Sequence, residues 1–261
     1  MKSFLIAVAV VLGLTAGLWI VALPEDVLVR QAEKALEGRN LSMEMTDLKK
    51  GLFYNFTINH AAVKKSSELL FSVDNLSGRI NPFSLLLLRL PLTFEGEAGG
   101  GRLFGRVELL RGKGETFITV DGMSMEKIPF FEELGMGGSG TLAGTLKMLG
   151  GTGSMKFSIK DLRFDSGTLF GIRIAPDMFR IARAALTIQG SVLRIDSFSL
   201  EGSGVYARVK GNIAGGKPDL TLEIMSDAPA ADLAPSLALL DNYRVSPGYY
   251  VIPVKELPSA K

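Results

Sequence analysis

The sequence contains no cysteine and a single histidine, His60, so the residues that most often hold metals or act as catalytic bases are nearly missing. Without cysteine, neither a disulfide nor a thiolate metal site can form. One histidine is too few for a His-rich metal site, and no nucleophile-elbow pattern accompanies it for a Ser-His-Asp triad. We therefore expect His60 at a strand end near a loop, and we expect no cofactor and no metal.

An excess of one charge sign is also lacking. The chain carries 29 Lys and Arg residues against 27 Asp and Glu residues, with no long block of like charge. Nucleic-acid binding needs a concentrated basic face, so no nucleic-acid partner is expected. The carboxylates are scattered over expected strand surfaces and turns and form no acid/base pair. These absences predict a protein that is not an enzyme.

Two glycine-rich motifs resemble nucleotide-binding loops but lack the required context. Residues 135–140 match G-x-G-x-x-G, yet a helix is expected before them and a strand after them, the reverse of a dinucleotide site. Residues 211–217 approach a P-loop, but Pro218 stands where Ser or Thr is needed and no helix follows. We interpret this second motif as a hairpin turn.

The strongest positive signal is a period of two over residues 186–225. Apolar and polar residues alternate in short runs, among them 193–196, 205–210 and 219–224. Breaks rich in glycine and serine separate these runs and have the composition of turns. A period of two indicates strands with one apolar and one solvated face. The segment therefore predicts an antiparallel meander.

Similar signals cover much of the rest of the chain. Strands are predicted at 41–45, 52–58, 69–73, 116–120 and 155–159, with further alternation over 90–109. A short helix is predicted over 125–134, whereas 83–88 and 176–184 are each compatible with helix or strand. Residues 101–109 and 140–148 share a G-x-L-x-G pattern, and many of the 30 glycines fall in or beside strands, which indicates curling. The predicted fold is mainly β: a curved, largely antiparallel meander sheet, groove-like or sandwich-like, with a few short helices.

The N-terminus has the length and composition of a membrane anchor. Residues 4–23 are uncharged and mostly apolar, and at about 1.5 Å per residue they span a hydrocarbon core of about 30 Å. A cleaved signal peptide is the alternative, although no clean A-x-A site is present. Lys2 precedes the segment while Glu25 and Asp26 follow it, which predicts export of the bulk of the chain. The expected anchor residues are Phe4, Leu5, Ile6, Val8, Val10, Leu12, Leu14, Leu18, Trp19, Ile20, Val21 and Leu23.

Composition divides the chain into four parts: the anchor (1–23), a stalk or capping helix (24–38), a β-rich domain (39–242) and an extended tail (243–261). The helix is predicted over Glu25–Glu37, because Pro24 precedes it and Gly38 ends it. Prolines in the tail confine it to an edge strand that covers its own sheet, or to an arm that docks on a partner.

The alternation also predicts one extended apolar face. Two outcomes are compatible with it: a closed core, or an open groove that marks a partner or lipid site. The residues expected on this face are Leu103, Val107, Leu142, Leu146, Met155, Phe157, Ile159, Leu186, Ile188, Val209, Leu222 and Ile224.

The N-terminal anchor, the LPEDVLVRQAEKALEG helix, the NPFSLLLL break and the G-x-L-x-G strands together resemble the type II secretion system protein N (GspN) family. The run GSVLRIDSFSLEGSG, followed by VKGNI, also resembles the AsmA-like group of envelope proteins. The first resemblance implies a single-pass protein of the bacterial inner membrane, with a periplasmic β-rich domain that serves the export machine together with other secretion-system subunits. The second implies, as an alternative, a protein that binds or transfers phospholipid on the apolar face. Neither resemblance brings catalytic residues.

Overall fold

The computed structural model describes residues 41–51, 54–65, 67–81, 84, 91–108, 115–133, 137–165, 167–169, 172–215, 217–227 and 240–255. The predicted anchor, the helix over Glu25–Glu37 and all of segment 83–88 except Ser84 lie outside these residues. Within them the chain is mainly β, and fifteen strands pair with their neighbours in antiparallel, meander order. The strands belong to two compact units, which we describe separately.

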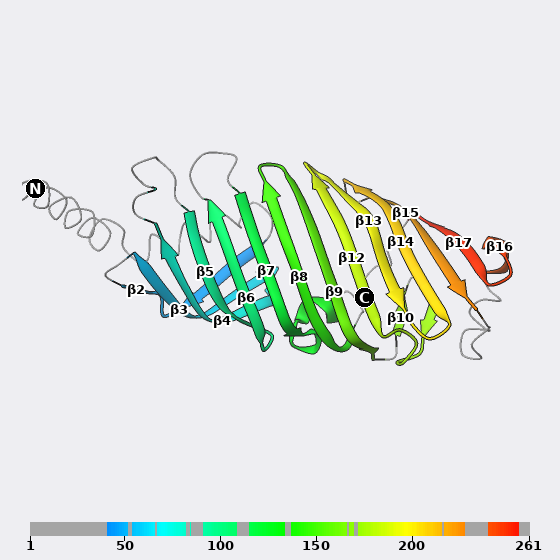
Figure 1. The fold of residues 1–261 in the computed structure, drawn as a ribbon, viewed down its shortest axis with the longest axis horizontal. Helices are drawn as coiled ribbons and strands as arrows, with labels where there is room; N and C mark the ends of the chain where they lie inside the picture. Colours follow the sequence, from blue (N-terminus) through cyan, green and yellow to red (C-terminus); the bar gives the residue numbers. More distant parts are fainter. Residues whose placement is uncertain are drawn as a thin grey trace, which may run out of the picture. The chain divides into compact units, whose positions relative to one another are not determined.

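Unit 1 is an antiparallel meander in which the hydrogen-bonded order is β1-β3-β4-β5-β6, with β2 paired to β3 (Figure 1). Its core contains Phe56, Ile58 and Ala61 from β3, against which Met45, Leu76 and Leu92 pack. The strands are β1 (Leu41–Thr46), β2 (Lys49–Lys50), β3 (Asn55–Lys65), β4 (Glu68–Ile80), β5 (Pro91–Ala98) and β6 (Gly101–Glu108).

Unit 2 is a longer meander with the order β7-β8-β9-β12-β13-β14-β15-β17-β16, and a separate two-stranded sheet, β10-β11. Its strands are β7 (Glu115–Ser124), β8 (Gly138–Leu149), β9 (Thr152–Phe164), β10 (Gly167–Leu169), β11 (Ile172–Ile174), β12 (Ile181–Gln189), β13 (Val192–Glu201), β14 (Val205–Ala214), β15 (Lys217–Ser226), β16 (Arg244–Ser246) and β17 (Tyr249–Val254). Three short helical segments accompany them: η1 (Met125–Lys127), α4 (Pro129–Glu133) and η2 (Asp241–Tyr243).

Bulges interrupt the strand pairing at a recurrent sequence pattern. The pairing register shifts at 74–77 in β4, 120–123 in β7 and 195–198 in β13, and β9 shifts against β8 within 160–163. In each case two apolar residues stand three positions apart instead of two, as in VDNL, VDGM, IKDL and IDSF. Gly122, Asn75 and Asp161 adopt positive φ at three of these places, which is typical of residues that tolerate the left-handed region. The extra residue returns the next apolar side chain to the same face and bends the strand.

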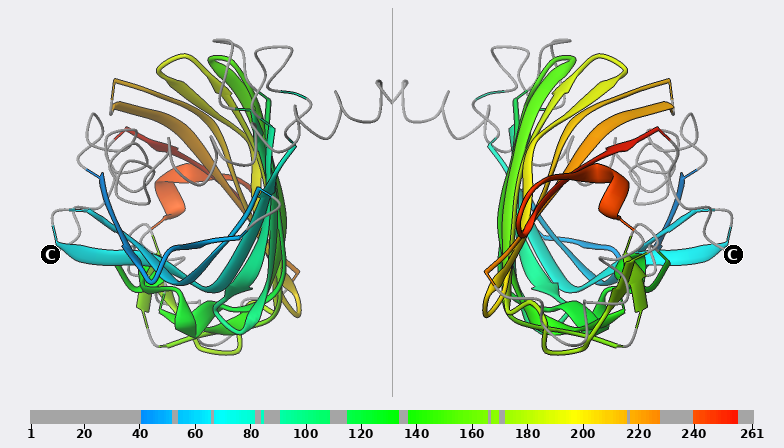
Figure 2. Two further views of the ribbon diagram at one scale, coloured as in Figure 1. Left: turned by 90° about the vertical axis from the view of Figure 1, so that its left-hand side faces the viewer. Right: turned by 90° about the vertical axis from the view of Figure 1, so that its right-hand side faces the viewer.

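The bends agree with the predicted curvature. Figure 2 shows the strands of unit 2 bending along their length. The predicted curled, antiparallel meander is therefore confirmed for this unit, and the bulges supply a physical cause for the bending.

Two aromatic rings of unit 1 lie over glycines on neighbouring strands. Phe94 pairs in register with Gly78; the ring of Phe56 occupies the space above Gly78, and the ring of Phe94 occupies the space above Gly105. A β-carbon at either glycine would meet the ring atoms. Glycine at these positions therefore allows each aromatic ring to pack directly against the backbone of the neighbouring strand. The ring covers backbone that a side chain would otherwise cover.

Several sequence predictions are settled by these elements. The helix expected over 125–134 is present as η1 and α4, separated by Ile128. The undecided segment 176–184 is a turn followed by β12. The predicted tail contributes β17, which pairs with β15, so it covers an edge of its own sheet. The division between the two units falls within the range predicted as one β-rich domain.

We expect Gly105→Ala to destabilise the protein by about 1–3 kcal/mol, because the new methyl group would displace the Phe94 ring from a packed position. Urea unfolding followed by circular dichroism measures the change. Gly151→Ala is the matched control, since nothing lies within 4 Å of a β-carbon built there. Equal effects of the two substitutions would show that the ring packing over Gly105 contributes nothing.

Candidate functional site

The apolar side chains of unit 2 share one face of the sheet, as the pairing register shows. Residues paired directly across antiparallel strands point to the same side. One such row crosses eight strands, and all of its members are buried. This buried row consists of Met123, Leu142, Ile159, Ala182, Leu200, Ala207, Ile224 and Tyr250.

Irregular segments close this face at one end of the strands. The buried residues of these segments are Met125 of η1, Phe131 of α4, Ile128 between the two helices, and Phe179. Leu162 of β9 is buried as well. Segment 176–180 is tied to the end of β9 by the Leu162 amide, which donates to the Arg180 carbonyl at 2.9 Å, and by the Phe164 amide, which donates to the Pro176 carbonyl at 3.2 Å. This capped end, the lower end of unit 2 in Figure 1, is a closed hydrophobic core.

Toward the opposite end, where hairpins turn at Gly150 and Gly190, the same face is less covered. A second row there contains Ile118, Leu146, Met155, Leu186 and Ile195, paired in succession on β7, β8, β9, β12 and β13. Every member of this half-exposed row has intermediate exposure. At about 4.8 Å between strands, the row extends across the sheet for about 19 Å. The apolar face of unit 2 is therefore a core at one end and a half-exposed apolar surface at the other.

The structure brings ten of the twelve predicted apolar residues together on this face. Leu142, Ile159 and Ile224 lie in the buried row, and Leu146, Met155 and Leu186 lie in the half-exposed row. Phe157, Ile188, Val209 and Leu222 occupy other register positions of the same face. Leu103 and Val107 belong to β6 of unit 1, and their place on a surface shared with the other ten stays a prediction.

The sequence analysis missed members of this face that follow or precede a bulge. Val120 and Met123, and likewise Ile195 and Phe198, stand three residues apart, so a strict period of two separates them. Two apolar residues three positions apart, with an acidic residue between them, form the sequence pattern that would have assigned both to the same face. Ile118, Leu220 and Tyr250 also belong to the face.

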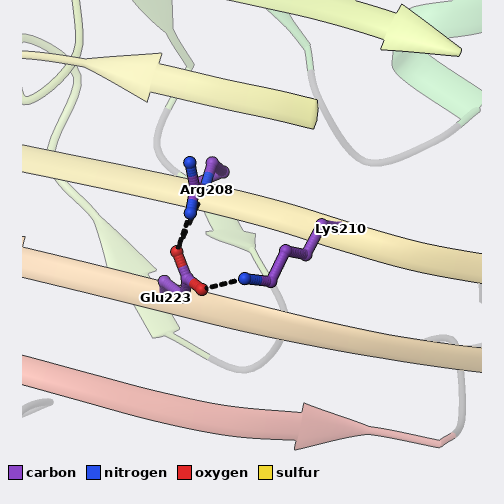
Figure 3. Close-up of polar contacts among 3 residues, drawn as sticks. All are labelled: Arg208, Lys210 and Glu223. Atoms are coloured by element: carbon purple, nitrogen blue, oxygen red, sulfur yellow. Dashed lines mark hydrogen bonds and ion pairs between the residues drawn. The ribbon is translucent and has the colours of Figure 1, made fainter. Parts of the chain in front are cut away.

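The opposite, polar face of unit 2 carries a buried carboxylate between two cations (Figure 3). Glu223 on β15 is only 5% exposed. Lys210 Nζ lies 2.6 Å from Glu223 Oε1, while Arg208 Nη2 and Nε donate to Oε2 at 2.7 and 3.0 Å. The hydrogen bond from Lys210, followed by that from Arg208, holds the pKa of Glu223 below its usual value although burial acts in the opposite direction. The hydrogen bond to Glu223 raises the pKa of Arg208.

His60 is placed differently from the prediction. Its Nδ1 lies 2.6 Å from Asp74 Oδ1 on the paired strand β4, and both side chains are exposed. The expectation of a strand end is wrong, because β3 continues beyond His60 to Lys65. Among the described residues, no group of three histidine or carboxylate side chains is placed to hold a metal ion.

The described part of the chain contains no helix that is long and apolar enough to cross a bilayer. Comparison with protein-family models, with curated proteins and with solved structures finds no match to this chain.

We expect Glu223→Gln to lower the free energy of unfolding at neutral pH by roughly 1–2 kcal/mol, since two cations lose their shared carboxylate. Because the folded-state pKa of Glu223 is lowered, its contribution is present above the unfolded-state pKa and is lost as pH falls through the folded-state pKa. The stability difference between the two proteins should therefore shrink in acid.

Urea unfolding of both proteins from neutral to acidic pH checks this dependence. Asp219→Asn is the matched control, as it removes a carboxylate from an exposed position of the same strand. A stability difference for Glu223→Gln that stays constant down to the lowest pH would contradict the assignment.

Proposed function

We propose that this protein is a non-enzymatic accessory component of the type II protein secretion system, anchored in the bacterial inner membrane with its β-rich part in the periplasm. It acts by contact, as a scaffold for other subunits of the secretion machine. The resemblance of the sequence to the GspN family supports this proposal, and it covers nearly the whole chain. The structural observation that carries the contact mechanism is the half-exposed row at the uncapped end of unit 2.

The half-exposed row has the properties of a contact surface. Five apolar side chains from five neighbouring strands lie side by side, and each retains part of its surface in solvent. Covering that surface would be favourable by about 25 cal/mol per Å² of apolar area removed from water. A contiguous exposed apolar surface on a folded protein commonly marks a partner or lipid site.

A polar substitution within this row should impair secretion. We expect Leu146→Asp to reduce export of type II substrates in cells that depend on this protein, because a carboxylate would have to be desolvated on contact. Leu149→Asp is the matched control: it lies on the same strand, alternates to the other face and is 59% exposed. Secretion is measured as substrate in the medium, and immunoblotting verifies the level of each variant.

Equal secretion by the Leu146→Asp variant and by the unaltered protein, at equal protein levels, would rule out this row as the contact surface. If complexes purified through the protein contained no secretion-system subunit, the scaffold function itself would be wrong.

The second candidate function is phospholipid binding or transfer, and one specific observation favours it. The rows on both sides of the half-exposed row are free of charged side chains on β8, β9 and β12: Met148, Gly153 and Ile188 lie on one side, and Gly144, Phe157 and Ala184 on the other. An uninterrupted apolar strip can hold an acyl chain laid across the strands, since no charge has to be desolvated.

Native mass spectrometry of the full chain, purified from its own envelope, tests the lipid function. A bound phospholipid mass that is lost in Leu146→Asp and retained in Leu149→Asp is the expected result if the strip holds acyl chains. A lipid-free mass for the unaltered protein, or equal lipid occupancy in both variants, would refute it.

A further inference from the structure

The polar face of unit 2 contains a depression of about 800 Å³ that the contact surface described above does not use. It extends over β7, β8, β9, β12 and β13. Two rows in register contribute most of its lining: Ala143, Ser158, Arg183 and Ser199 form one, and Thr145, Lys156, Ala185 and Ser197 form the other. The side chains of these two rows alternate with the apolar ones, which places the depression on the opposite side of the sheet from the half-exposed row. Val120, Gly144, Phe157 and Ala184, which lie between the two rows, also border it.

Small side chains produce this depression. Ala143, Ser158, Ala185, Ser197 and Ser199 occupy neighbouring positions on four strands. Alanine and serine are weaker strand formers than the threonine, valine or tyrosine that commonly occupy solvated strand positions. These small side chains therefore leave a hollow in this part of the face, although residues with a higher strand propensity would stabilise the strands more. A ligand can approach the backbone closely there.

The depression also carries uncompensated positive charge. Arg183 is held by Glu201, and elsewhere on the face Arg194 pairs with Asp196 and Arg208 with Glu223. Lys156, by contrast, has no carboxylate partner among the described residues. Asp121 at the β7 border is already engaged in an interaction of its own.

Lys147, on the adjacent strand, reinforces the positive charge. Its ammonium lies 5.6 Å from the centroid of the Phe117 ring and makes no ion pair within the described part of the chain. Lys147 and Lys156 are diagonal neighbours across β8 and β9, because Lys156 pairs with Thr145. Two cations so close favour an acidic occupant.

The hydroxyl groups of the floor indicate the kind of occupant. Ser158, Ser197 and Ser199 can each donate and accept a hydrogen bond. A peptide backbone presents both N–H donors and carbonyl acceptors, so it can use both capacities of these hydroxyl groups. Five strands span about 19 Å, the length of about six residues of extended chain. We propose that this depression binds an acidic, extended segment of a partner protein, with Lys156 pairing with one of its carboxylates.

Fluorescence anisotropy of the full chain in detergent, with fluorescein-labelled hexaglutamate as the probe, tests this proposal. Hexaglutamate should bind and hexalysine should not. Lys156→Glu should weaken binding by about tenfold or more, because it replaces attraction by repulsion at the floor. Lys217→Glu is the matched control, with the same change of charge at the exposed β14–β15 turn, and it should leave binding within about twofold, since charges beyond a Debye length are screened.

A variant that fills the depression tests whether hexaglutamate binds inside it or is only attracted by the positive charge around it. Ala185→Tyr fills the floor with a good strand former, so binding should be lost while the thermal unfolding temperature is retained; Ser197→Tyr fills it from the next strand should the first variant fail to fold. Three results would each overturn the proposal: no hexaglutamate binding, equal weakening by Lys156→Glu and Lys217→Glu, or full binding by a folded tyrosine variant. Displacement of hexaglutamate by millimolar inorganic phosphate or by phosphatidylglycerol vesicles would likewise overturn it in favour of a simple anion site.

Discussion

The architecture of unit 2 depends on one constraint: each strand must keep its apolar side chains on a single face while the strand bends. A period of two achieves this only in a nearly straight strand. At 120–123, 159–162 and 195–198 the chain inserts one residue, which allows the bend and returns Met123, Leu162 and Phe198 to the apolar face. Without these insertions every later side chain of the strand would change faces. The buried row and the polar depression both exist because the insertions preserve this separation.

The two faces consequently differ in how they are stabilised. On the apolar face, burial of side chains such as Met123 and Leu200 removes hydrocarbon from water. On the polar face, cross-strand ion pairs satisfy charges; the clearest is Glu223, which lies between Arg208 and Lys210. Their geometry depends on the pairing of β14 with β15. The ion pairs therefore require the observed register of the two strands as well as the charged residues themselves.

Much of the strand content was predictable from the sequence, because alternation is a local property. The runs around Leu193, Val209 and Leu222 all fall in strands, and the helix predicted near residue 125 is present as η1 and α4. Local patterns could not show which part of the apolar face is covered. That outcome depends on where η1, α4 and segment 176–180 pack, which is a tertiary property.

The candidate sites were predictable only in part. Leu146 and Met155 were recognised as apolar face residues, but their partial exposure follows from the packing of distant segments. Lys156 and Ala185 are unremarkable in sequence, and only the register places them side by side. The same holds for His60 and Asp74, which lie fourteen residues apart and meet because β3 pairs with β4.

The meander order also has a consequence for the route by which the chain acquires its structure. Strands that are adjacent in the sheet are mostly adjacent in the chain; β8 and β9 are joined by only Gly150 and Gly151, and β12 and β13 by Gly190 and Ser191. Short loops close at little entropic cost, and sheets built from local contacts fold faster than those that need distant pairings. Each hairpin can therefore form as soon as its second strand has been synthesised and is free to pair. Growth of the sheet then follows the order of synthesis, and the β16–β17 pair is added last, through the pairing of β17 with β15.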